Sequence, residues 1–161
     1  MMRLFLSLIA FLLMDVAEAA TSASSCAKQN TALHIKLVSE KLKISLHDSI
    51  DLSVTITNSS SQPVQLIPFM ELESYWLRFE VVDEKNRRVR WLGPEVKMIE
   101  NASRVTLYQG YYWGRRFEHF EQLYDLSKIG KYRVRAIYGV SPDGLCPIGK
   151  AISNSIDLTI N

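Results

Sequence analysis

The sequence has little of what an enzyme or a metalloprotein requires. Only three of its 161 residues are histidine and two are cysteine. Zinc needs three or four convergent ligands, and the spacing of His34, His47 and His119 provides no ligand pair. The His-Glu-x-x-His motif and the Gly-x-Ser-x-Gly nucleophile elbow are both absent. We therefore expect a protein that is not an enzyme, with no catalytic residues, no metal and no cofactor.

Long apolar runs are also missing, apart from one at the N-terminus. Residues 4–14 are almost entirely apolar, but a membrane-spanning helix needs about 20 such residues. Arg3 precedes the run, and Ala17-Glu18-Ala19 has the small-x-small pattern that signal peptidase accepts. These features predict a cleaved secretory signal over residues 1–19, with the mature chain beginning at Ala20 or one residue later. We expect a periplasmic or secreted protein without membrane insertion.

A strong excess of one charge is the third absence. The predicted mature chain would carry 18 basic and 15 acidic residues. This excess is too small to indicate nucleic acid or an anionic membrane as a partner. Basic residues nevertheless recur on one strand and near it, and they form either a solvated strand face or a patch for an acidic partner. They are Lys131, Arg133 and Arg135, with Arg78, Arg87, Arg88 and Arg90 elsewhere.

The two cysteines, Cys26 and Cys146, both belong to the predicted mature chain. In an oxidising compartment we expect a disulfide between them rather than two unlinked thiols. Closing so long a loop would stabilise the fold by roughly 4–5 kcal/mol. Asn58 and Asn101 match the N-glycosylation acceptor, which has meaning only in a eukaryotic source. In a bacterial chain they are ordinary turn residues.

The rest of the chain shows the alternation of apolar and polar residues that is typical of strands. Polar turn residues, such as those at 58–63 and 83–86, separate the alternating stretches. This pattern predicts an all-β fold, an immunoglobulin-like antiparallel β-sandwich of seven to nine strands over residues 32–161. A flexible leader over residues 20–31 would precede it. The clearest alternation covers residues 33–37, 42–46, 50–56, 77–81, 132–138 and 156–160.

Residues 124–134 resemble the Asp-x-Gly-x-Tyr segment that leads into strand F of immunoglobulin-like domains. Asp125, Gly130 and Tyr132 are the matching residues. The resemblance implies a structural corner in which the Tyr132 hydroxyl bonds back to the backbone. Antibody domains have an inter-sheet cysteine where this chain has Val134, so the disulfide of that family is not the one expected here.

A narrower resemblance is to small bacterial secreted immunoglobulin-like modules. It covers roughly residues 32–161 and is similar to the non-catalytic module next to deuterolysin-type (peptidyl-Lys) metalloendopeptidases and to the intracellular proteinase-inhibitor sandwich. The zinc motif of those peptidases is absent, so the resemblance implies only binding, spacing or inhibition. The stretches that carry it are residues 54–60, 79–84, 105–107, 124–127 and 153–156.

The segment 108–117 gathers residue types that are enriched at protein-binding hot spots. Alternation cannot bury Tyr111, Tyr112 and Trp113 on one face, so we expect at least one of them to be exposed. With Arg115 and Arg116 they either cover the open end of the sandwich or bind a protein partner. The leading interpretation is an exported protein-binding module, such as an inhibitor or an immunity protein. The alternative is a structural or accessory subunit of a periplasmic or cell-surface assembly.

Overall fold

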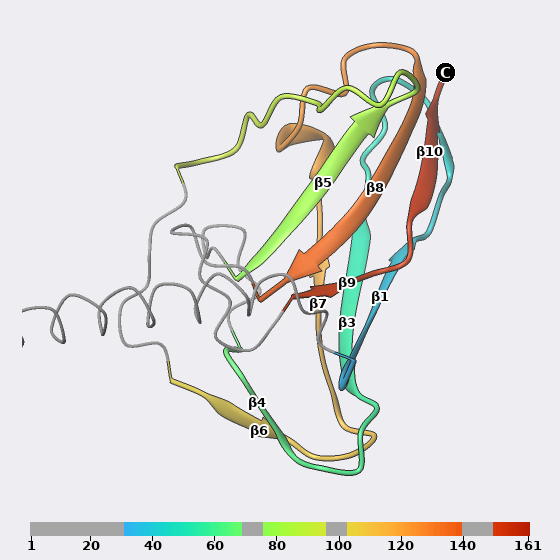
Figure 1. Cartoon of the computed structure of the whole chain (residues 1–161). Helices are drawn as coiled ribbons and strands as arrows, with labels where there is room; N and C mark the ends of the chain where they lie inside the picture. The colour runs from blue at the N-terminus through green and yellow to red at the C-terminus, as the bar shows by residue number, and fades with distance from the viewer. Residues whose placement is uncertain (1–30, 69–75, 96–102, 140–149) are drawn as a thin grey trace, which may run out of the picture.

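The computed structural model describes residues 31–68, 76–95, 103–139 and 150–161, which form two facing β-sheets (Figure 1). The first sheet has the order β1 (Leu33–Ser39), β3 (Leu52–Asn58) and β7 (Tyr112–Phe117). The second has the order β2 (Lys43–Ile44), β10 (Ile156–Ile160), β8 (Gly130–Tyr138) and β5 (Leu77–Asp83), and β9 (Ala151–Ile152) also pairs with β8. A separate ribbon joins β4 (Val64–Leu66) to β6 (Val105–Leu107), and a short 3-10 helix, η1, covers Phe120–Gln122.

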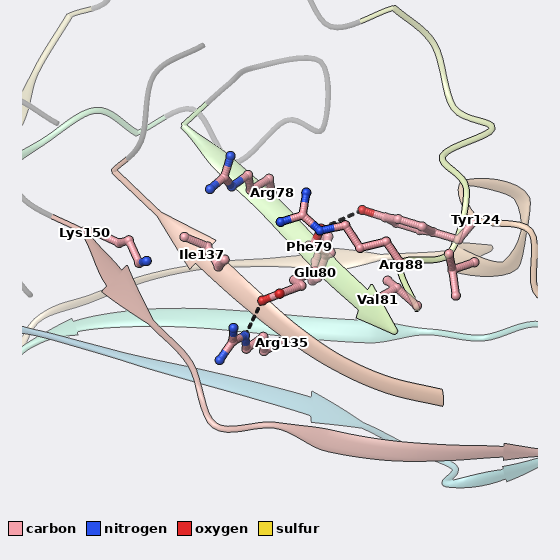
Figure 2. Close-up of a pocket in the computed structure, with 10 residues that line it drawn as sticks. Arg78, Phe79, Glu80, Val81, Arg88, Tyr124, Arg135, Ile137 and Lys150 are labelled. Atoms are coloured by element: carbon pink, nitrogen blue, oxygen red, sulfur yellow. Dashed lines mark hydrogen bonds and ion pairs between the residues drawn. The ribbon is translucent and has the colours of Figure 1, made fainter. Parts of the chain in front are cut away.

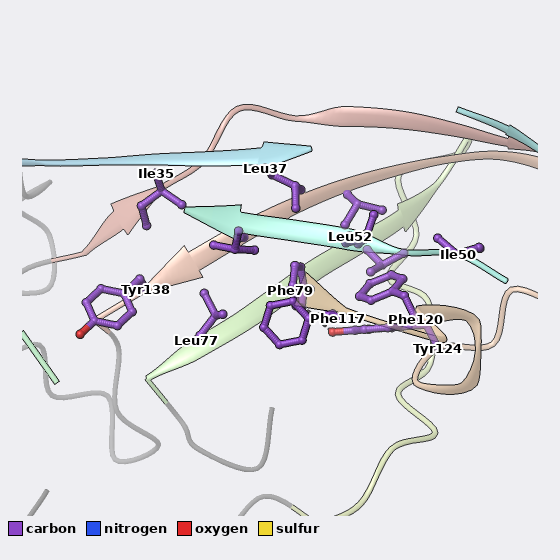
Figure 3. Packing of buried hydrophobic residues seen from close by; sticks show 14 of the residues in the cluster. Ile35, Leu37, Ile50, Leu52, Leu77, Phe79, Phe117, Phe120, Tyr124 and Tyr138 are labelled. Atoms are coloured by element: carbon purple, nitrogen blue, oxygen red, sulfur yellow. Dashed lines mark hydrogen bonds between the residues drawn. The ribbon is translucent and has the colours of Figure 1, made fainter. Parts of the chain in front are cut away.

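The core lies between the two sheets, because the apolar members of each alternating strand face inward (Figure 3). Its centre is a chain of aromatic rings. Phe79 of β5 meets Phe117 of β7 at a centroid distance of 5.1 Å and Phe120 at 5.0 Å, both edge to face. Tyr124 continues the chain, 5.1 Å from Phe120. This arrangement confirms the predicted immunoglobulin-like sandwich.

Strand number and direction differ in detail from the prediction. Ten strands lie in the described residues, and four of them comprise only two or three residues. The pairing is antiparallel except between β10 and β2, where Thr159 lies parallel to Lys43. The expectation that residues 42–46 form an alternating strand is wrong. The backbone of Leu42 and Leu46 bonds to Thr159 and Asn161 at the end of β10, but both side chains are exposed and only Ile44 is buried.

The hairpin after β5 is short. It ends after a single bridge between Val82 and Arg88. Trp91 leaves the hairpin and pairs instead with Tyr124, where the two rings meet edge to face at 5.1 Å. This contact closes the core beside η1, so the segment after the turn packs across the sandwich rather than extending the sheet.

Several predictions fall outside the described residues. These are the signal and leader, Cys26, Cys146 and Asn101, so the disulfide and the processing site remain predictions. Within the residues that the structure describes, no helix is long and apolar enough to cross a membrane.

Candidate partner-binding site

Strand β7 carries the aromatic and arginine residues and lies at the edge of its sheet (Figure 1). Residues directly opposite each other in an antiparallel pair project to the same face. Trp113 and Arg115 therefore share the core-facing side with their β3 partners, whereas Tyr112 and Arg116 project from the outer face. The register opposes Trp113 to Ile56, Arg115 to Val54, Phe117 to Leu52, Tyr112 to Thr57 and Arg116 to Ser53.

The aromatic side chains of this segment are exposed. The exposed fractions are 63% for Tyr111, 71% for Tyr112 and 40% for Trp113, and Tyr108 beside them is 56% exposed. The interpretation that they cover the open end of the sandwich stays a prediction. Only Phe117, at the far end of β7, reaches the opposite sheet and is buried. We expected at least one of Tyr111, Tyr112 and Trp113 to be exposed, and all three are.

The two arginines differ in their surroundings. Arg116 forms ion pairs with Asp51, at 2.7 Å, and with Glu40, at 3.2 Å. Its hydrogen bond is the main reason why the pKa of the Asp51 carboxyl lies below its usual value. The Arg115 guanidinium lies 5.6 Å from the centroid of the Phe117 ring, a cation–π distance. Arg116 thus holds the strand in place, whereas Arg115 lies over the buried ring of Phe117.

The outer edge of β7 presents backbone groups as well as side chains. The backbone N–H of Asn58 donates a hydrogen bond to the Tyr111 carbonyl at 3.1 Å. This bond determines which residues of β7 direct their backbone groups toward β3. Because bonded positions alternate, the peptide groups of Tyr112, Gly114 and Arg116 point away from β3. In the described part of the chain, no strand pairs with this side of β7. Such an edge is where an extended segment of another protein can add a strand.

Asn58 supports this segment and was missed as a structural residue. Its side chain is fully buried and its amide donates to the carbonyls of Gln62 and Leu107, both at 2.8 Å. Its side-chain oxygen accepts bonds from the Ser60 backbone and hydroxyl. The backbone carbonyl of Asn58 also accepts a bond from the Gly110 amide. A buried, fully bonded amide cannot carry a glycan in the folded state. Asparagine followed by serines after a strand is the sequence signal for such a turn.

One serine, one histidine and one carboxylate come together without forming a catalytic triad. Nδ1 of His119 lies 3.3 Å from the Ser49 hydroxyl and 3.3 Å from the Glu121 carboxylate. A triad requires the two partners on different ring nitrogens, and here they share one. Glu121 instead accepts a 2.8 Å bond from the Ile50 amide, which fixes the chain beside β3. The described residues contain no group of three or more His, Cys, Asp or Glu side chains placed to hold a metal ion.

The residues assigned to the structural corner lie at the start of β8. The Tyr132 hydroxyl donates a 2.8 Å hydrogen bond to the Lys128 carbonyl, and burial raises the pKa of this phenol. Asp125 accepts a 2.7 Å bond from the Ser127 hydroxyl and lies 3.2 Å from the Arg90 guanidinium. Gly130 begins the strand. These contacts anchor the backbone that leads into β8.

Comparison with known proteins shows that this chain resembles solved structures in its fold. No family model matches the chain, and no curated protein matches it. Among solved structures, the CARDB domain of PF1109 from Pyrococcus furiosus, in complex with di-metal ions, is 10% identical, with a TM-score of 0.42 over 80% of this chain and 87% of that one. The chain is a small immunoglobulin-like β-sandwich.

Two β-glucosidases show a similar likeness over a small part of their length. The enzyme from Erythrobacter marinus is 15% identical with a TM-score of 0.42, and the match covers 80% of this chain and 15% of the enzyme. The enzyme from Listeria innocua, in complex with glucose, is 17% identical with a TM-score of 0.40, covering 80% and 16%. At these values the likeness concerns the sandwich alone and carries no argument about function.

Proposed function

We propose that this chain is an exported, non-enzymatic protein-binding module whose partner contacts β7. One observation carries the proposal: Tyr108, Tyr111, Tyr112 and Trp113 expose 40–71% of their surface along one edge segment. Other large aromatic side chains of the described residues are buried in the core, as Phe79, Phe117 and Phe120 are, or packed against it, as Trp76 and Trp91 are. Exposed clusters of this kind mark interaction surfaces, because they leave apolar area in water.

The partner is a protein that presents an extended segment to this edge. The outward peptide groups of Tyr112, Gly114 and Arg116 supply main-chain hydrogen bonds for such a segment. Gly114 lies between Tyr112 and Arg116 along the strand, where a Cβ would come within 3.2 Å of the Val54 carbonyl oxygen. Trp113 and Arg115 supply contacts on the other face. An inhibitor or immunity protein fits this mode of binding. The narrower resemblance to secreted modules beside metalloendopeptidases is compatible with it.

A second candidate function uses the same edge. An accessory subunit of a periplasmic or cell-surface assembly would accept a strand from its neighbour at β7. The peptide groups at the edge favour this role as much as they favour an inhibitor. The size of the native complex distinguishes the two, since an assembly subunit would be isolated with several different chains.

The test begins with capture of a partner by the mature protein from extract of its source and measurement of the affinity of the purified pair. Trp113→Ala and Tyr112→Ala should each weaken binding by about thirtyfold, the effect of losing an anchor worth about 2 kcal/mol. Ile129→Ala is the matched control, because Ile129 is 72% exposed but lies outside β7, before β8. Its affinity should equal that of the parent.

Hydrogen exchange in the complex provides an independent readout. Strand addition should slow exchange at the amides of Tyr112, Gly114 and Arg116, which point away from β3 in the isolated chain. The amides of Trp113 and Arg115 already bond to β3 and should change little. Equal binding by the parent and both aromatic variants, with no new protection along β7, would overturn the proposal.

A further inference from the structure

The outer face of the second sheet contains a depression of about 330 Å³ (Figure 2). It lies over β5 and β8, on the side of the sheet away from the core. Phe79 and Val81 of β5 face inward, so Arg78 and Glu80 face outward, and Glu80 lies directly opposite Arg135 of β8. We call this depression the basic groove and define it by Arg78, Glu80, Arg88, Arg135, Ile137 and Lys150.

Four separate segments bring basic side chains to the basic groove. Arg78 comes from β5 and Arg135 from β8. Arg88 follows the turn after β5, where it bridges to Val82, and Lys150 directly precedes β9, which pairs with β8. Residues far apart in the sequence are therefore collected at one place by the pairing of the sheet. The sequence patch considered above included Arg78, Arg88 and Arg135 but not Lys150.

The charges in the basic groove do not balance. Among the described residues that line it, Glu80 is the only acidic one, and it is already paired with the Arg135 guanidinium. Arg78, Arg88 and Lys150 form no ion pair with any described residue. Arg135 foremost, and more weakly Arg88 and Arg78, keep the pKa of the Glu80 carboxyl below its usual value. Three cations thus surround a neutralised pair and create a local field that attracts anions.

We propose that the basic groove binds a compact polyanion, a ligand with two or more neighbouring phosphate, sulfate or carboxylate groups. Guanidinium groups match such oxyanions in geometry and form short, charge-assisted hydrogen bonds with them. The volume corresponds to the lower end of small-molecule sites, so the ligand group is small. Ile137 provides an apolar wall beside the cations. This site is separate from β7 and does not depend on the proposed protein partner.

Titration calorimetry at low ionic strength with inorganic pyrophosphate tests the proposal. Arg88→Gln and Lys150→Gln should each weaken binding by about tenfold, the usual effect of losing one charge-assisted hydrogen bond. Glu80→Gln should bind more tightly than the parent, because it removes a repelling carboxylate and releases Arg135. This gain of affinity cannot result from damage to the fold. Lys36→Gln is the charge-matched control, since Lys36 is exposed on β1 of the other sheet and should leave affinity unchanged.

Three results would overturn the proposal. The first is no binding of pyrophosphate by the parent at millimolar concentration. The second is an equal loss in Lys36→Gln and Arg88→Gln, which would indicate diffuse attraction to a basic chain. The third is an affinity of Glu80→Gln no higher than that of the parent. A lipid headgroup carries the same phosphate chemistry as a soluble ligand. Sedimentation with phosphatidylglycerol vesicles that Arg88→Gln abolishes identifies the lipid source, and calorimetric binding without sedimentation identifies the soluble one.

Discussion

Asn58 connects three parts of the chain through a single buried side chain. Its amide reaches Gln62 in the turn after β3 and Leu107 at the end of β6, and its backbone carbonyl holds Gly110 before β7. Every polar atom of the side chain has a partner, which is the condition under which a buried amide stabilises a fold. The position of the exposed tyrosines therefore depends on a residue that is itself inaccessible.

Replacement of Asn58 by aspartate should destabilise the protein strongly. The new carboxylate would lose both donors and face two carbonyl oxygens in a buried position, at a cost of about 3 kcal/mol or more. Ser59→Asp adds the same charge at the neighbouring exposed position and should change stability by less than about 0.5 kcal/mol. Urea unfolding of both variants measures the difference. Equal unfolding midpoints would contradict the structural role assigned to Asn58.

Among the elements, β7 departs furthest from its sequence pattern. Its residues do not alternate between apolar and polar, and only Phe117 is buried. The strand exists because β3 provides a complete ladder for it and because Arg116 ties it to Asp51, the residue before β3. Only one side chain of the strand, Phe117 at its end, is buried. The rest of the strand is held by its backbone hydrogen bonds to β3 and by this ion pair.

The Asp51–Arg116 pair predicts a dependence of stability on pH. Arg116 lowers the pKa of Asp51 below its ordinary value of 3.8, so the folded state favours the ionised carboxylate. This contribution is present above the ordinary pKa and is lost as the pH falls through the lowered value. At neutral pH, Asp51→Asn should melt below the parent, and the two melting curves should converge in acid. A difference in melting temperature that stays constant with pH would show that the ion pair is not its cause.

At the scale of the molecule, the two outer faces of the sandwich differ in chemistry. The outer face of the first sheet combines Ser53, Thr55 and Thr57 with the exposed edge of β7. The outer face of the second carries the basic groove. One small domain thus presents an aromatic edge and a cationic surface on separate sheets, so mutations in one should leave the other unaffected.

The mature protein is predicted to begin at Ala20 or Thr21 and to contain no free thiol. Removal of the secretory signal would leave Cys26 and Cys146 in an oxidising compartment, where a disulfide forms. Intact mass after export, with alkylation before reduction, measures both properties. Addition of two alkyl groups would contradict the disulfide, and a mass that includes residues 1–19 would contradict the cleavage. Full alkylation after reduction is the control.

The alternation of apolar and polar residues along the sequence determined where most of the long strands of the sandwich lie. Strands β1, β3, β5, β8 and β10 lie where apolar residues alternate with polar ones, since period-two alternation places one set of side chains in the core. The same pattern failed at residues 42–46, where the backbone bonds to the end of β10 but the side chains of Leu42 and Leu46 remain exposed. Alternation indicates which side chains share a face, whereas the tertiary structure decides which of them are buried.

Only the tertiary structure decided which residues form the two candidate binding surfaces, the edge of β7 and the basic groove. The position of β7 at a sheet edge follows from strand order, which residues 108–117 do not encode locally. Burial of Asn58 depends on carbonyls at Gln62 and Leu107, the second of them 49 positions away. The basic groove needs both Lys150 and Arg78 in its lining, which follows from the pairing of β9 and β5 with the same strand, β8. Strand periodicity is a property of neighbouring residues, but a binding surface is formed by residues that distant pairing brings together.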